Sequence, residues 1–315
     1  MPADKSQLLM KAFVSRLDKT GNLEDAVDVA DAYSSISDME LQRTILNYVV
    51  ENEQSSIAEK NERGSIIYGL LKSIFLSADS TNKIDLTNVL GIPSIYEIDN
   101  KGLRDTSGKI IQQVFWYGDE DGKIYFPAFI NSFSPKEWKI TAKKEWYEIS
   151  SLKGNVWIYA NRPLDNDANL DDSAQIHLNK YLEENDLHPS VIVHRGHSYW
   201  LPRTIRRMPG DAKIVLLGSC GGYKNLNDII DSNPDAHIIS TKEIGAGEIN
   251  RPISNYLNQA FESGASISWK NMWASLTRLF SADPNKKLLE SWEDYIPPYK
   301  NLGAIFIKAY NKKME

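Results

Sequence analysis

From residue 110 onwards the sequence alternates short apolar runs with stretches of helical period, and this alternation restricts the fold more than any other feature. The clearest apolar runs lie at residues 110–117, 156–160, 190–194, 212–217 and 236–240. Strands that alternate with helices indicate βαβ units, which build a mostly parallel sheet covered by helices. We therefore expect an α/β domain over residues 110–262.

The rest of the chain divides into three segments. Residues 1–90 show apolar positions at helical spacing and no strand pattern, which predicts a small all-α domain. Residues 91–109 are rich in turn-forming residues and are expected to form a linker with a short hairpin. Residues 263–315 are expected to be a C-terminal helical cap that packs on the α/β domain.

Composition argues against several functional classes. The net charge is −6, with 42 acidic and 36 basic side chains, so we expect no binding to nucleic acid. No apolar stretch approaches the roughly 20 residues that span a bilayer, and the chain starts without a signal-peptide pattern, which predicts no membrane binding and a cytoplasmic location. The single cysteine forms no disulfide, and we expect no metal and no cofactor, because neither metal-ligand spacing nor a phosphate-binding glycine loop occurs.

Two predicted strands end in reactive residues. The run at 191–193 continues into His-Arg-Gly-His, which ends at His197, and the run at 214–217 continues into Gly-Ser-Cys-Gly-Gly, which contains Cys220. One short helix joins the two strands, so they should be parallel neighbours with their carboxyl ends at the same edge of the sheet. Because ligands bind beyond that edge in open α/β sheets, we expect His197 and Cys220 to lie side by side at a functional site.

This pair has the chemistry of a nucleophile and its acid/base partner. A neighbouring imidazolium lowers the pKa of a thiol from about 8.5, and the thiolate is the attacking species. The same histidine protonates the leaving amine. Main-chain N–H groups at the turn around Gly221 are expected to stabilise an oxyanion. His194 is the competing histidine, but we favour His197 because it lies nearer the strand end.

The two motifs resemble those of the caspase-like cysteine peptidase clan, which includes caspases, metacaspases, gingipains, clostripain, separase and CHAT domains. In that clan one apolar strand ends in Gly-His-Gly and the next ends in a small residue followed by cysteine. Residues 196–198, Gly-His-Ser, match the first ending, and residues 219–221, Ser-Cys-Gly, match the second. The chain is also similar to bacterial proteins with the same motif pair.

The resemblance covers the α/β segment and leaves the N-terminal helices unexplained. It implies a doubly wound sheet in three layers, αβα, and a cysteine endopeptidase that cuts protein or peptide substrates with Cys220 and His197. It also implies that the main-chain N–H of Ser198 contributes to the oxyanion hole. Ser198 stands where the clan usually has glycine, and the segment between histidine and cysteine is shorter than in caspases. An inactive scaffold that binds a protein partner, with the N-terminal helices as its docking module, is therefore an alternative.

An acidic cluster, Asp119, Glu120 and Asp121, follows the first strand. In the clan, loops at this point help to build the pocket for the residue before the cleaved bond. The resemblance therefore implies a preference for arginine or lysine at that position. A charged turn in solvent is the simpler interpretation of the same residues.

Residues 218–222 also fit the pattern Gly-x-Cys-x-Gly, the nucleophile elbow of glutamine amidotransferases and of hydrolases similar to dienelactone hydrolase. Those folds place the histidine after the nucleophile, and only His237 follows Cys220 in this chain. His237 opens a predicted strand, so an elbow hydrolase or amidotransferase is the weaker alternative.

Overall fold

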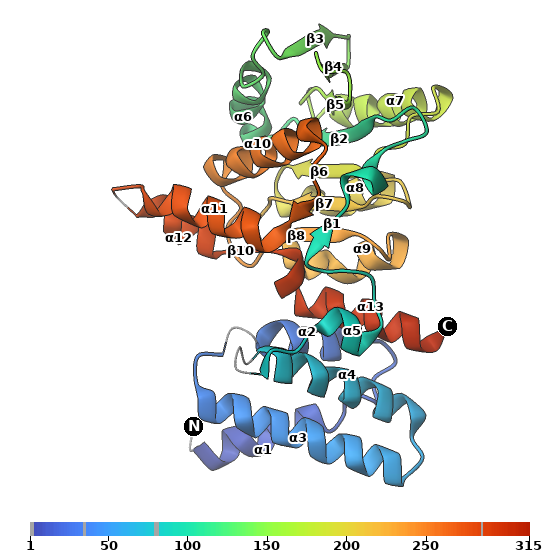
Figure 1. The fold of residues 1–315 in the computed structure, drawn as a ribbon, viewed down its shortest axis with the longest axis vertical. Helices are drawn as coiled ribbons and strands as arrows, with labels where there is room; N and C mark the ends of the chain where they lie inside the picture. The colour runs from blue at the N-terminus through green and yellow to red at the C-terminus, as the bar shows by residue number, and fades with distance from the viewer. Residues whose placement is uncertain (1–2, 34–35, 79–81, 285) are drawn as a thin grey trace. The chain divides into compact units, whose positions relative to one another are not determined.

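The computed structural model describes residues 3–33, 36–78, 82–284 and 286–315. The chain divides into two compact units, one made of Met1–Ile95 and Tyr299–Glu315 and the other of Tyr96–Pro298. The second unit contains the large sheet (Figure 1).

The elements described in the first unit are helical. They are α1 (Ala3–Val14), α2 (Glu24–Tyr33), α3 (Met39–Ala58), α4 (Glu62–Ala78), α5 (Leu86–Leu90), the short 3-10 turn at Pro298–Lys300 and α13 (Leu302–Met314). Helix α13 packs against α2 and α4, and the Gly303 N–H donates a 2.7 Å hydrogen bond to the Asp31 carboxylate. We expected residues 263–315 to form one cap on the α/β domain, but these contacts place residues 299–315 in the helical unit.

The second unit contains an eight-stranded mixed sheet. In spatial order its strands are β10 (Tyr295–Ile296), β8 (His237–Thr241), β7 (Ile214–Leu217), β6 (Val191–Arg195), β2 (Ile110–Trp116), β5 (Val156–Asn161), β4 (Trp146–Ser151) and β3 (Trp138–Ala142). The five strands from β8 to β5 are parallel, the hairpin of β3 and β4 extends one edge, and β10 pairs antiparallel at the other. The predicted α/β class and the mostly parallel sheet are confirmed.

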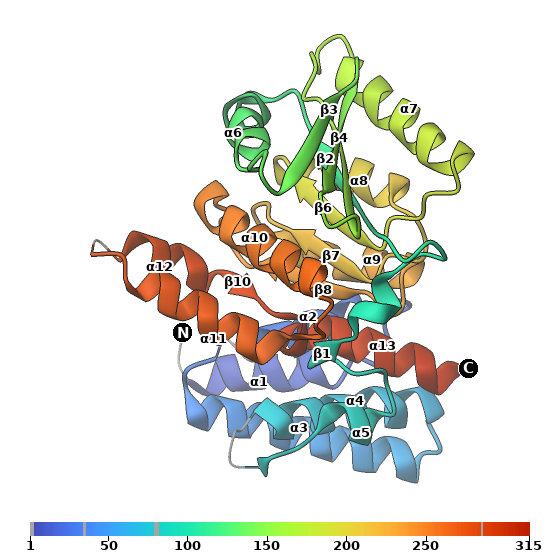
Figure 2. The same cartoon turned by 45° about the horizontal axis from the view of Figure 1, so that its top comes forward.

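Helices cover both faces of this sheet (Figures 1 and 2). One face carries α6 (Glu120–Asn131) and α10 (Gly247–Ser263), and the other carries α7 (Leu170–Glu184), α8 (Leu201–Arg207) and α9 (Leu226–Ser232). The central strand β2 is buried along its whole length because both of its faces are covered. Helices α11 (Trp269–Ser281) and α12 (Lys287–Glu293) follow α10 along the chain.

The segment that we expected to be a linker with a hairpin is part of the second unit from Tyr96 onwards. Strand β1 (Glu97–Ile98) pairs with β9 (Ile267–Ser268), and a short 3-10 helix follows at Asn100–Leu103. An antiparallel bridge then joins Arg104 to Ile110 around a tight turn. None of the helices in the described ranges is long and apolar enough to cross a membrane.

The order of the parallel strands locates the ligand-binding edge. Counted along the chain, β5, β2, β6, β7 and β8 have the spatial order 2-1-3-4-5. The order reverses between β2 and β6, and sheets of this kind bind ligands outside the carboxyl ends of the strands at such a reversal. The carboxyl end of β2 leads to Asp119, and that of β6 leads to His197.

Candidate active site

The register of β6 and β7 places His197 and Cys220 at equivalent positions beyond the sheet. The strands are parallel, and His194 faces Leu217 at the last pair of the ladder. His197 and Cys220 are each the third residue after that pair. The expectation that the two strands are parallel neighbours is therefore confirmed, and among the described residues no hydrogen bond is found between the His197 and Cys220 side chains.

The loop that carries Cys220 is held by close packing against α10. The Asn250 side chain donates a 2.9 Å hydrogen bond to the Gly218 carbonyl oxygen, and a Cβ atom at Gly218 would lie 2.1 Å from the Asn250 Oδ1. Gly221 has a φ of 62°, a left-handed conformation that favours glycine. The thiol of Cys220 is free and exposed, so it is accessible to a substrate.

Strand β8 supplies a second support for the same loop. The Thr241 hydroxyl donates to the Ser219 carbonyl oxygen and accepts a 3.2 Å hydrogen bond from the Gly222 N–H. Both residues that flank the Cys220–Gly221 turn are thus bonded to one buried side chain. The loop is held at two points, as a nucleophile must be if its position is to be defined.

His197 is accessible to solvent, with its side chain 39% exposed. Its Nε2 atom is 3.7 Å from the Oδ2 atom of Asp121, in the first turn of α6. Its ring stacks on Tyr199 with centroids 5.2 Å apart and planes 15° apart. These two contacts restrict the orientation of the imidazole while leaving it accessible.

The main-chain N–H groups around Cys220 and His197, the proposed catalytic dyad, differ from the expected set. The Gly221 N–H donates a 2.8 Å hydrogen bond to the Glu243 carbonyl oxygen, so it is not free to bind an oxyanion as we expected. The Ser198 N–H opens a short 3-10 helix, Ser198–Trp200, where the first N–H groups have no partner within the helix. Among the described residues, no partner is found for the Ser198 or the Cys220 N–H.

His194 is fully buried and supports the main chain next to it. Its Nδ1 atom lies 2.8 Å from the Thr204 hydroxyl, and its Nε2 atom lies 3.2 Å from the carbonyl oxygen of Gly196 and 3.3 Å from that of His197. Carbonyl oxygens only accept, so Nε2 carries the proton and Nδ1 accepts from the hydroxyl. Burial lowers the pKa of His194 to about 4, which makes it a neutral positioning residue at pH 7.

The three residues of the acidic cluster do not act together. Asp119 is 7% exposed; it accepts from the Gly122 N–H at 2.8 Å as the N-cap of α6 and from the Trp200 indole N–H at 3.0 Å. Glu120 is exposed to solvent. Of the three, Asp121 is the one in contact with His197, and the preference for a basic side chain before the cut stays a prediction.

His237 lies at the opposite end of the sheet from Cys220. It faces Ile214, the first residue of β7, whereas Cys220 follows the last residue of that strand. Its Nδ1 atom accepts a 2.8 Å hydrogen bond from the Trp269 indole N–H. The nucleophile-elbow interpretation requires a histidine beside Cys220, and His237 does not meet that requirement.

Sequence reasoning did not find two residues beside the dyad. The Tyr295 hydroxyl, on β10, accepts from the Ala246 N–H at 2.8 Å and lies 3.0 Å from the Asn250 Oδ1. Burial raises the pKa of Tyr295. The second residue is Arg195, which directly precedes the Gly-His motif. Tyr295 lies on β10, and a strand of only two residues is too short for a periodic pattern to show in the sequence.

Comparison with known protein families, curated proteins and solved structures found no match. Within the ranges that the structure describes, no cluster of three or more histidine, cysteine, aspartate or glutamate side chains is placed to hold a metal ion.

Proposed function

We propose that the α/β unit is a caspase-like cysteine peptidase domain, doubly wound in three αβα layers, that cuts protein or peptide substrates with Cys220 and His197. The observation that carries this proposal is the β6–β7 register, which brings both residues to equivalent positions beyond one edge. The strand order and the helices on both faces support the caspase-like assignment. The helical unit is proposed to be a small all-α domain that binds a protein partner.

The proposed reaction begins when His197 takes the proton of the Cys220 thiol. The thiolate attacks the carbonyl carbon of the scissile peptide bond, and the oxygen becomes an oxyanion. The free N–H groups of Ser198 and Cys220 are the proposed donors to that oxyanion. His197 then donates its proton to the leaving amine, which leaves a thioester. Water hydrolyses the thioester with His197 as general base and regenerates the thiol.

Asp121 is the proposed positioning residue for His197. Its carboxylate limits the orientations of the imidazole that accepts the thiol proton. The pair is 3.7 Å apart with both side chains well exposed, so its contribution to stability is at most about 1 kcal/mol. We therefore assign Asp121 to the orientation of the imidazole and not to the stability of the fold.

The test is cleavage of a peptide library by the full chain, read by mass spectrometry. We expect new termini with the unaltered protein and none with Cys220→Ala or His197→Ala. The matched control is His177→Ala, an exposed histidine on α7 that pairs with Glu145 at 2.7 Å. Cleavage that persists in Cys220→Ala would refute the assignment. Absence of cleavage by a folded, unaltered chain would favour the alternative, an inactive scaffold.

A further inference from the structure

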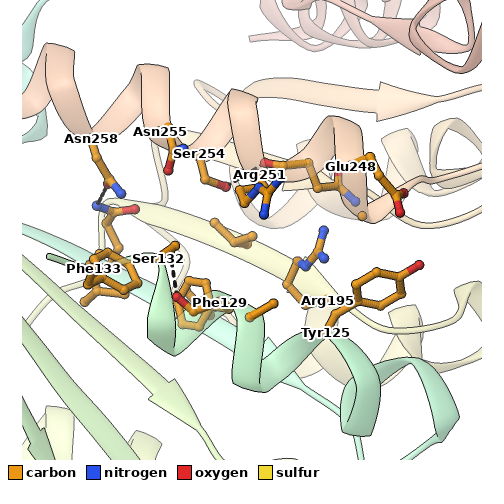
Figure 3. A pocket seen from close by; sticks show the side chains of 17 residues that line it. Tyr125, Phe129, Ser132, Phe133, Arg195, Glu248, Arg251, Ser254, Asn255 and Asn258 are labelled. Atoms are coloured by element: carbon orange, nitrogen blue, oxygen red, sulfur yellow. Dashed lines mark hydrogen bonds between the residues drawn. The ribbon is translucent and has the colours of Figure 1, made fainter. Parts of the chain in front are cut away.

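A cavity lies on one face of the sheet, between α6 and α10 (Figure 3). Its volume is about 180 Å³. Its apolar surface comes from the strand residues Val114, Ile158 and Val193, from Phe129 on α6 and from Phe133 just after α6. Pockets that combine apolar walls with a few polar groups are typical binding sites for small molecules.

Arg195 is the polar group that distinguishes this cavity. It lies on β6, and its guanidinium carbon is 5.2 Å from the centre of the Trp116 ring. Its Nη1 atom is shielded from solvent and has no hydrogen-bond partner among the residues that the structure describes. Burial lowers the pKa of Arg195, yet an arginine stays charged in proteins. A shielded N–H donor without an acceptor is unfavourable, and an anionic ligand would accept from it.

The other charged residues of the lining indicate the charge of that ligand. Figure 3 shows Arg195, Arg251, Glu248 and Tyr125 at one end of the cavity and Asn258 at the other. Arg195 and Arg251 are opposed by Glu248 of the lining and by Asp121, whose charge also acts on Arg195. A ligand with one negative charge can pair with Arg195 and meets less repulsion from these carboxylates than a phosphate dianion would.

We propose that this cavity binds a small monocarboxylate whose carboxylate pairs with Arg195 and whose apolar body lies on Val114, Val193 and Phe129. The guanidinium presents two N–H groups in the geometry that a carboxylate accepts. The amide side chains of Asn258 and Gln112, bonded to each other at 2.7 Å, close the far end. The Cys220 thiol is not part of the lining, and binding of the carboxylate does not require peptidase activity.

The test is calorimetric titration of the full chain with hexanoate, with hexanamide as the neutral analogue and hexyl phosphate as the dianion. We expect saturable binding of hexanoate and weaker binding of both analogues. Arg195→Met should weaken hexanoate binding about tenfold or more, because it removes a charge-assisted hydrogen bond. Arg203→Met is the matched control, since Arg203 lies on α8 and pairs with Asp172 at 3.3 Å.

A second variant keeps the test decisive if Arg195→Met does not fold. Ser254→Phe places a large side chain in the cavity from α10 and leaves Arg195 in place. We expect it to abolish hexanoate binding. The proposal is overturned if the unaltered chain does not bind hexanoate, if either variant binds it as well as the control does, or if hexyl phosphate binds more tightly than hexanoate.

Discussion

Acid should destabilise the α/β unit through His194, the buried histidine that holds the main chain before the Gly-His motif. Burial lowers its folded pKa to about 4 from the usual value of 6.5. Between pH 4 and pH 6.5 the imidazole is therefore mostly neutral in the folded state and mostly protonated in the unfolded state. The resulting stability is complete above pH 6.5 and is lost as the pH falls towards 4.

The size of this effect follows from the shift. Each pKa unit corresponds to about 1.4 kcal/mol, so the folded state should lose about 2 kcal/mol by pH 5 and about 3 kcal/mol by pH 4. His194→Gln carries no titrating group and should lack this part of the pH dependence. The difference between the two proteins removes the contribution of the carboxylates that titrate in the same range.

Urea unfolding followed by tryptophan fluorescence measures this difference for the α/β unit. All 8 tryptophans lie between residues 116 and 292, so the signal reports the α/β unit alone. His188→Gln is the control, because His188 is exposed and Asp186 raises its pKa by a side-chain hydrogen bond. Equal pH dependence in the unaltered chain and in His194→Gln would refute the assignment of His194 as a buried neutral residue.

Three further predictions concern the loops around the dyad. Gly218→Ala should destabilise the α/β unit by about 1–3 kcal/mol in the same unfolding assay, because the new Cβ would lie 2.1 Å from Asn250; Gly102→Ala, with no atom within 4 Å of its Cβ, is the control, and equal stability of the two variants would contradict the packing argument. Asp121→Asn should lower kcat/KM about tenfold and shift the pH–rate profile, because it removes the carboxylate that orients the imidazole; Glu120→Gln should have little effect, and an equal loss in both variants would remove the positioning role. Fluorogenic substrates with arginine or lysine before the cut should be cleaved faster than those with aspartate or alanine, because the exposed Asp121 carboxylate lies next to His197; equal rates would exclude this preference.

The sequence was most informative where burial imposes a strict pattern. Strand β2 is buried throughout, and the apolar run at 110–117 predicts it to within one residue. Strand β10 pairs over only two residues, which is too short for a period to show. The apolar residues of α13 predict a helix but not its neighbours, because an apolar helical face does not specify the surface that covers it.

The same distinction applies to the site. The glycine at 221 predicts the turn, and its positive φ agrees. The hydrogen bond from its N–H to Glu243 depends on a loop that follows another strand, and local sequence carries no signal for it. For Asp119 the sequence shows a carboxylate after a strand, but only the fold shows that both of its oxygens are used by the helix cap and by Trp200.

The central claim is that His197 activates the thiol of Cys220, and the pH dependence of alkylation tests it most directly. Iodoacetamide reacts with the thiolate, and the single cysteine gives an unambiguous readout by intact mass. We predict rapid modification of Cys220 below pH 7 in the unaltered chain and much slower modification in His197→Ala, with His177→Ala unchanged. Slow alkylation below pH 7 in the unaltered chain, with the rate of His197→Ala the same, would contradict the catalytic assignment.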